Sequence, residues 1–120
     1  LVQRVGSLMG NDMQEIPPEA VGNLPVSSAN LDVVRRAMEA VCTRGTAMRA
    51  FIGATVPMAG KSGTAEAPPN EPHGWFVGYA PADDPQIAVA VVLEHGGEGG
   101  RNAAPLFRQV VEAHLDSLEP

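Results

Sequence analysis

Two stretches of the chain repeat apolar residues at the spacing of an amphipathic helix. We predict the first helix over residues 31–42, with Ser27 and Ser28 among its capping residues and Gly45 as its stop. Asp32 in the first turn would suit the helix dipole. One face carries the apolar residues at intervals of three and four: Leu31, Val34, Met38, Val41 and Cys42.

The second amphipathic stretch lies near the end of the chain. It favours a helix with Pro105 in the first turn and Asn102 as the N-cap. Its apolar face has the same periodic spacing and includes one histidine: Leu106, Phe107, Val110, Val111, His114 and Leu118.

Three segments between these helices are typical of strands: residues 61–65, 75–80 and 86–93. The last is apolar at every position from Ile87 to Leu93, which predicts a strand covered on both faces of its sheet. Residues 1–5 form a weaker candidate strand. Glycine- and proline-rich connections are expected between the elements, the last of them a flexible break: residues 51–60, 67–72, 81–85 and 96–100.

The order helix, strand, strand, strand, helix indicates an α+β fold, with helices packed on an antiparallel sheet. Hydrophobic residues make up 44% of the 120 positions and charged residues 18%, as in a globular domain or a piece of one. The net charge of −6 argues against a nucleic-acid groove or an anionic membrane surface as partner. Cys42 is the only cysteine, so the chain has no internal disulfide.

The first candidate for chemistry is the string Gly60-Lys61-Ser62, which ends like a phosphate-binding loop. That motif needs a glycine at the position of Thr55 and a helix directly after the serine. Gly63 and the proline-rich loop that follows exclude such a helix. We therefore reject a nucleotide site.

The same residues favour a different site if they form the edge of a sheet. Alternation would place the hydroxyls of Ser62 and Thr64 on one face, with no side chain at Gly63 between them. Two hydroxyls with the Lys61 ammonium nearby make a receptor for a carboxylate, and the bare glycine lets a substrate backbone lie along the strand. The Thr64 amide would point at a developing oxyanion.

The surrounding residues give this string a family resemblance. The Lys-Ser-Gly-Thr-Ala string from Lys61 is followed by a proline-rich loop, by His-Gly-Trp-Phe-Val-Gly-Tyr-Ala-Pro from His73, and by an apolar strand ending in Glu-His-Gly-Gly. Upstream stand Arg-Arg-Ala-Met-Glu-Ala-Val from Arg35 and Gly-Thr-Ala from Gly45. Together they resemble the C-terminal part of the transpeptidase domain of class B, elongation-type penicillin-binding proteins, over essentially the whole chain.

The resemblance implies a fragment of the penicillin-binding and serine β-lactamase-like fold, spanning residues 1–120, in a peptidoglycan D,D-transpeptidase. It gives Lys61 and Thr64 catalytic roles, as the source of positive potential and as an oxyanion donor. Lys61, Ser62, Gly63 and Thr64 would bind the substrate, with no cofactor and no metal. The expected ligands are the peptidoglycan stem peptide and β-lactams, at the outer face of the bacterial cytoplasmic membrane, with the anchor outside this chain.

Two further motifs of that family do not stand in these residues. No serine has a lysine three positions later, since Lys61 is the only lysine. Ser28-Ala29-Asn30 matches Ser-x-Asn in letters, but it lies at a helix start, where both polar residues are better explained as caps. We therefore expect this chain alone to be inactive. We expect its partner to be the missing N-terminal half of the domain, with a homodimer through an exposed sheet edge as the alternative.

A non-catalytic module that senses β-lactams or binds peptide carboxylates remains the alternative function, because sensor domains share the same string. A plain structural domain is disfavoured by the extent of the resemblance. The other candidate residues are assigned structural roles. His73, His95 and His114 lack the short spacing of metal ligands, Cys42 is core filler, Trp75 is core or cleft wall, and Glu98 is solvated.

Overall fold

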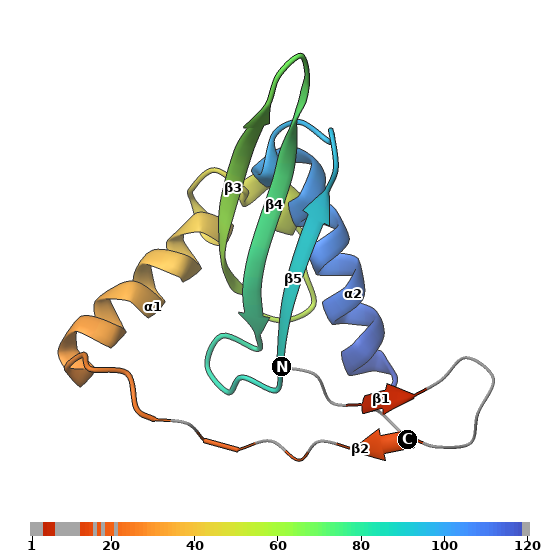
Figure 1. Ribbon diagram of the computed structural model, residues 1–120. Helices are drawn as coiled ribbons and strands as arrows, with labels where there is room; N and C mark the ends of the chain where they lie inside the picture. The colour runs from red at the N-terminus through yellow and green to blue at the C-terminus, as the bar shows by residue number, and fades with distance from the viewer. Residues whose placement is uncertain (1–3, 7–12, 16, 18, 21, 119–120) are drawn as a thin grey trace.

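A computed structural model describes residues 4–6, 13–15, 17, 19–20 and 22–118 of the chain. It contains a small two-stranded sheet, a three-stranded sheet and two α-helices, joined by short helical turns (Figure 1). The elements in chain order are β1 (Arg4–Gly6), β2 (Met13–Glu15), α1 (Ser28–Thr43), the 3-10 turn η1 (Met48–Phe51), β3 (Ala59–Ala67), β4 (Asn70–Ala80), β5 (Ile87–Leu93), the π-helical turn η2 (Gly99–Ala103) and α2 (Ala104–Asp116).

The larger sheet confirms the predicted α+β class. Its order is β3-β4-β5, and both neighbouring pairs run antiparallel. Ser62 lies opposite Phe76, and Phe76 lies opposite Val91, so these three side chains share one face. Among the described residues, β3 and β5 each pair with β4 alone and are therefore the two edges.

Helix α1 begins earlier than its apolar pattern predicts. Its N-cap is Ser27, whose side chain accepts a hydrogen bond from the amide of Asn30 at 3.3 Å. The early start moves Asp32 beyond the first turn, so its predicted place at the helix dipole is wrong. Asp32 instead pairs with Arg35 one turn later, at 3.4 Å.

The sheet extends into residues that the sequence assigned to loops. The predicted loop at 67–72 is wrong, because β4 begins at Asn70 and Ala67 pairs with Asn70 across a two-residue Pro68-Pro69 connection. This tight connection has none of the glycine or asparagine signals of common hairpin turns. Of the candidate strand at 1–5, the structure describes only residues 4–5, within β1, and the rest lies outside the described residues.

The start of α2 also differs from the expectation. Pro105 lies in the first turn as predicted, but the N-cap is Ala103 and makes no side-chain hydrogen bond. Asn102 instead donates from Nδ2 to the carbonyl of Gly96 at 2.6 Å. The helix ends at Asp116, so Leu118 lies beyond it.

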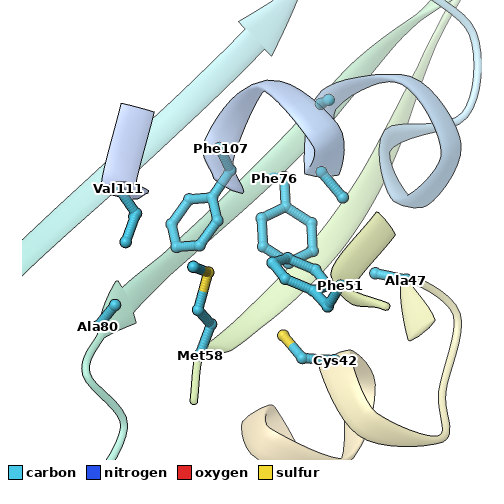
Figure 2. Packing of buried hydrophobic residues seen from close by; sticks show 10 residues of the cluster. Cys42, Ala47, Phe51, Met58, Phe76, Ala80, Phe107 and Val111 are labelled. Atoms are coloured by element: carbon cyan, nitrogen blue, oxygen red, sulfur yellow. The ribbon is translucent and has the colours of Figure 1, made fainter. Parts of the chain in front are cut away.

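Three phenylalanines from three elements form the centre of the core (Figure 2). Phe51 of η1, Phe76 of β4 and Phe107 of α2 have ring centroids 5.0 to 6.1 Å apart. Tilted and edge-on contacts at this spacing are favourable aromatic geometries. Met58 and Val111 belong to the same cluster and lie next to Phe107 (Figure 2). This core fixes the inner face of the sheet, which is the face that carries Phe76.

The outer face of the sheet is open among the described residues. Trp75, Val77 and Val92 lie side by side there and expose 40%, 39% and 44% of their surface. No helix crosses this face in the view of Figure 1. The expectation that β5 is covered on both faces is therefore met on the inner face only, and Trp75 is an exposed residue, not a core one.

None of the described helices is both long enough and apolar enough to cross a membrane.

Burial in the core changes the acidity of the Cys42 thiol. It is buried with 4% of its surface exposed, as predicted for core filler, and burial raises the pKa of its thiol from 9.0 to about 11. The neutral thiol thus stabilises the fold fully below pH 9, and this contribution is lost as the pH rises through about 11.

We predict slow alkylation of Cys42. At pH 8 the thiolate fraction is about one in a thousand in the folded chain and about one in ten in the unfolded chain. Iodoacetamide should therefore react about a hundredfold faster with the urea-unfolded chain than with the folded one, as followed by mass spectrometry. Equal rates in the two states would contradict this assignment of the residue.

Candidate functional site at the edge of β3

The predicted site string lies in the middle of an edge strand. Residues 61–64 belong to β3 and pair with residues 74–77 of β4, so the string is extended and not coiled at a helix start. The side of β3 that faces away from β4 pairs with no other described strand. An edge strand of this kind offers a free row of backbone N–H and C=O groups to a ligand.

The register separates the side chains of the string onto two faces. Ser62 and Thr64 lie opposite Phe76 and Gly74 and so belong to the inner face, as the alternation predicts. Lys61 projects from the outer face, and its Nζ donates to the carbonyl of Ser62. The two hydroxyls therefore share one face, whereas the ammonium of Lys61 contacts the strand backbone from the other face.

Thr46 is a site residue for which the sequence predicted no role. It follows α1 in the loop before η1, and its hydroxyl lies 3.0 Å from the hydroxyl of Ser62. Thr46 could have been found only through the family resemblance, to which the Gly45-Thr46-Ala47 string contributed. The contact between Thr46 and Ser62 joins residues 16 positions apart, and no local sequence pattern predicts a contact over that separation.

The glycine-rich segment after β5 packs directly on the strand. Residues 96–100 were expected to be a flexible break, but a Cβ added at Gly99 would overlap the carbonyl oxygens of Gly63 and Trp75. At Gly100 an added Cβ would come within 2.9 Å of the Thr46 carbonyl and 3.6 Å of the Ser62 Cβ. Glycine is required here because backbone packs on backbone.

Two histidines hold this segment to the start of β4. The backbone amide of His95 donates to Nδ1 of His73 at 3.0 Å, and the two rings lie 4.7 Å apart. Nδ1 of His95 lies 2.9 Å from the carbonyl of Glu71. His95 has a φ of 51°, in the left-handed region, so the turn that starts the segment is sharp. No group of three or more potential metal ligands occurs among residues that the structure describes.

Arg108 of α2 braces the segment that carries Thr46. Its guanidinium donates to the carbonyls of Ala50, Ile52 and Gly53 at 2.7 to 3.2 Å, which satisfies carbonyls at the end of η1. Nε of Arg108 pairs with Glu112 at 2.8 Å. These contacts fix the loop before β3 to the helix on the inner face.

An open hollow of about 530 Å³ lies beside Thr46, the residue whose hydroxyl contacts Ser62. Thr46 and Gly100 are part of its lining, and a Cβ added at Gly100 would lie 3.6 Å from the Ser62 Cβ. The complete lining comes from three segments: Thr46, Arg49, Ala50, Glu98, Gly100, Arg101 and Pro105. Glu98 is exposed, as predicted. A second, more apolar hollow of about 420 Å³ near Cys42 and Met48 contains none of the predicted site residues.

The fold and the site together define an α+β domain with two hydroxyl side chains on one face of an edge strand. The family model for the penicillin binding protein transpeptidase domain matches residues 2–112. The chain therefore belongs to the penicillin binding protein transpeptidase domain family, as the resemblance indicated.

Named relatives support this membership. The chain is 41% identical over 91 residues to the peptidoglycan D,D-transpeptidase MrdA of Haemophilus influenzae, covering 63% of this chain and 14% of that protein. It is 36% identical over 121 residues to the peptidoglycan D,D-transpeptidase PbpA of Mycobacterium tuberculosis, covering 92% and 24%.

Solved structures show the same fold. Pseudomonas aeruginosa PBP2, in complex with WCK 5153, matches with a TM-score of 0.74 and 39% identity over 87% of this chain and 24% of that one. Penicillin-binding protein 2B of Streptococcus pneumoniae matches with a TM-score of 0.74 and 28% identity over 89% and 19%. The chain thus spans about a quarter or less of each of these proteins.

We predict that Gly99→Ala distorts the site. The added methyl group overlaps the carbonyls of Gly63 and Trp75, so the substitution should destabilise the fold by about 1–3 kcal/mol, as overpacking does. Urea unfolding measures the loss. Gly22→Ala is the matched control, because nothing lies within 4 Å of its added Cβ. An unchanged unfolding midpoint for Gly99→Ala would refute the close packing.

Proposed function

We propose that this chain supplies the strand that binds the substrate carboxylate and the oxyanion in a peptidoglycan D,D-transpeptidase. The observation that carries the proposal is the position of residues 61–64 on the free edge of β3, with the hydroxyls of Ser62 and Thr64 on one face. The names of the relatives, which include two D,D-transpeptidases, support the substrate class.

The proposed reaction is serine acyl transfer on a D-Ala-D-Ala stem. A serine outside these 120 residues attacks the penultimate carbonyl, D-Ala leaves, and an amine from a neighbouring stem resolves the acyl-enzyme. Ser62 and Thr64 hold the terminal carboxylate through their hydroxyls. The Thr64 amide is one of the oxyanion donors, a contribution of about 3–4 kcal/mol in the transition state.

Lys61 has a separate role in this proposal. Its side chain leaves the outer face of β3, away from the hydroxyl pair, and contacts the Ser62 carbonyl. We assign it to the side of the site where the nucleophile acts, where its positive potential assists proton transfer. β-Lactams mimic the dipeptide and would acylate the same serine, at the outer face of the bacterial cytoplasmic membrane, where peptidoglycan is assembled.

Penicillin labelling tests the proposal. The chain alone should not label, because loss of the nucleophile in a serine hydrolase lowers the rate about a millionfold. The longer protein that carries these residues should label covalently. There, Thr64→Val should slow labelling about 10- to 100-fold, since it removes a hydrogen bond to a charged group.

Thr43→Val is the matched control, because its hydroxyl bonds only to the Glu39 carbonyl within α1. Stable labelling of the chain by itself would contradict the assignment of the nucleophile to another segment. Carboxylate binding by the longer protein without acylation would favour the alternative, a non-catalytic module that senses β-lactams or binds peptide carboxylates.

We also propose that another polypeptide segment covers the outer face and the β5 edge. The exposed Trp75, Val77 and Val92 form an apolar surface next to a strand edge that no described strand pairs with. The proposed occupant is the remainder of the transpeptidase domain, because the chain spans only 14% to 24% of the relatives compared above. A homodimer through the same edge is the alternative.

We predict that the isolated chain self-associates through this surface. Light scattering after size exclusion should show dimers or larger species, and Val92→Lys should shift them toward monomer because it places a charge on the edge strand. Val110→Lys, on the exposed side of α2 (48% exposed), is the control. A well-folded monomer of the unmodified chain would count against the proposal.

A further inference from the structure

A hydrogen bond between two histidines joins β4 to the glycine segment, residues 95–100, and this bond depends on protonation. The backbone amide of His95 donates to Nδ1 of His73 at 3.0 Å. An imidazole nitrogen accepts a hydrogen bond only while it carries no proton. The contact therefore requires a neutral His73 ring whose single proton is on Nε2.

The ring of His95 differs, because its contact is kept in either protonation state. Its Nδ1 lies 2.9 Å from the carbonyl oxygen of Glu71, and a carbonyl only accepts, so this Nδ1 carries a proton. A second proton on Nε2 of His95 would break neither contact. The ring centroids are 4.7 Å apart, so a charge on one ring disfavours a charge on the other. His73 is thus the member of the pair whose protonation breaks a contact.

The amide that His73 accepts from belongs to a sharp turn. His95 has a φ of 51°, in the left-handed region, which a residue other than glycine keeps only where the surrounding contacts hold it there. A second bond to β4 runs from the Gly97 amide to the Pro72 carbonyl at 2.9 Å. His73 therefore holds the first residue of the glycine segment in its strained conformation.

The other end of the glycine segment lies against the candidate site. A Cβ added at Gly99 would overlap the carbonyl oxygen of Gly63. A Cβ added at Gly100 would come within 2.9 Å of the Thr46 carbonyl and 3.6 Å of the Ser62 Cβ. The position of this backbone beside Ser62 thus depends on how the segment is held where it begins.

Other charged groups occur on the elements around the histidine pair. They come from β3, from β4, from the turn after β5 and from the start of η2: Glu66, Glu71, Glu94, Glu98 and Arg101. All five side chains are exposed, and within the part of the chain that the structure describes none forms an ion pair with either ring. Exposed charges are screened by water and salt. The hydrogen bond from His95 therefore determines which protonation state of His73 suits the segment.

We propose that His73 is a positioning residue that makes the candidate site pH-dependent through the glycine segment. Neutral His73 fixes His95 and, through the segment, the backbone beside Ser62. Histidine takes up its second proton between about pH 8 and 5, so the contact is present at the upper end of this range and is lost as the pH falls. The His95 amide then lacks its acceptor, and the backbone beside Ser62 becomes less ordered. The inference rests on the proposed function for the activity that is regulated.

The test measures penicillin acylation of the longer protein that carries this chain between pH 7.5 and pH 5. In H73N the amide oxygen can accept from the His95 backbone as Nδ1 does, but it does not titrate. Each rate profile is normalised to its own value at pH 7.5. The unmodified protein should then fall about three- to tenfold further than H73N by pH 5. H114N, which removes a titrating histidine from α2, is the matched control and should follow the unmodified protein.

Two further measurements identify the histidine and the segment. H95N keeps the backbone amide and places asparagine, which tolerates the left-handed region, at position 95, so it should retain the pH dependence of the unmodified protein. Hydrogen exchange of a peptide spanning residues 93–100 is corrected for the intrinsic exchange rate at each pH. Protection should fall about three- to tenfold from pH 7.5 to pH 5 in the unmodified protein but not in H73N. The unmodified protein alone keeps this measurement decisive if H73N fails to fold.

The outcomes separate this inference from the proposed function. Identical normalised profiles for the unmodified protein and H73N, or protection of the segment that does not change with pH, overturn the role of His73. Loss of the pH dependence in H95N or H114N overturns it as well, because another histidine would then be the sensor. If exchange behaves as expected but penicillin does not label the longer protein, the pH-sensitive contact stands and the transpeptidase proposal falls.

Discussion

Direct contact between backbones at residue 99 is the constraint on which the site depends. A side chain at Gly99 would overlap the carbonyls of Gly63 and Trp75, and an added Cβ at Gly63 would lie 3.2 Å from the Trp75 Cβ. The segment after β5 therefore rests on β3 and β4 with no side chain between them. Because Gly100 continues this contact toward Thr46, main-chain packing defines the wall beside Ser62, and rotamer changes at the surface leave that wall in place.

Polar contacts to the backbone hold the two loops that flank this packing. At one end, the His95 amide donates to His73 and the Gly97 amide donates to the Pro72 carbonyl at 2.9 Å. At the other end, Arg108 donates to one carbonyl within η1 and two after it, and it is itself paired with Glu112. These bonds satisfy groups that a turn would otherwise leave without partners, so the loops are ordered by the same contacts that position the site.

Sequence patterns predicted the helices and strands that are determined by their own residues. The 3.6-residue period over 31–42 predicted α1, and the apolar run at 87–93 predicted β5, because each pattern depends on the residues of one element alone. The face shared by Ser62 and Thr64 followed from strand alternation alone. The contact of Thr46 with Ser62 was beyond such patterns, since it depends on how α1, β3 and η2 pack. The prediction that residues 96–100 form a flexible connection was wrong for the same reason. The glycines of this segment are needed because its backbone packs closely on other backbone.

Alternation along β3 separates the ammonium of Lys61 from the hydroxyls of Ser62 and Thr64. Lys61 leaves β3 on the outer face, whereas Ser62 and Thr64 lie on the inner face. Because side chains alternate over residues 61–64, a shift of one residue in the pairing of β3 with β4 would move the hydroxyls of Ser62 and Thr64 to the outer face. The register of β3 against β4 is therefore as important for the chemistry as the identity of the residues on it.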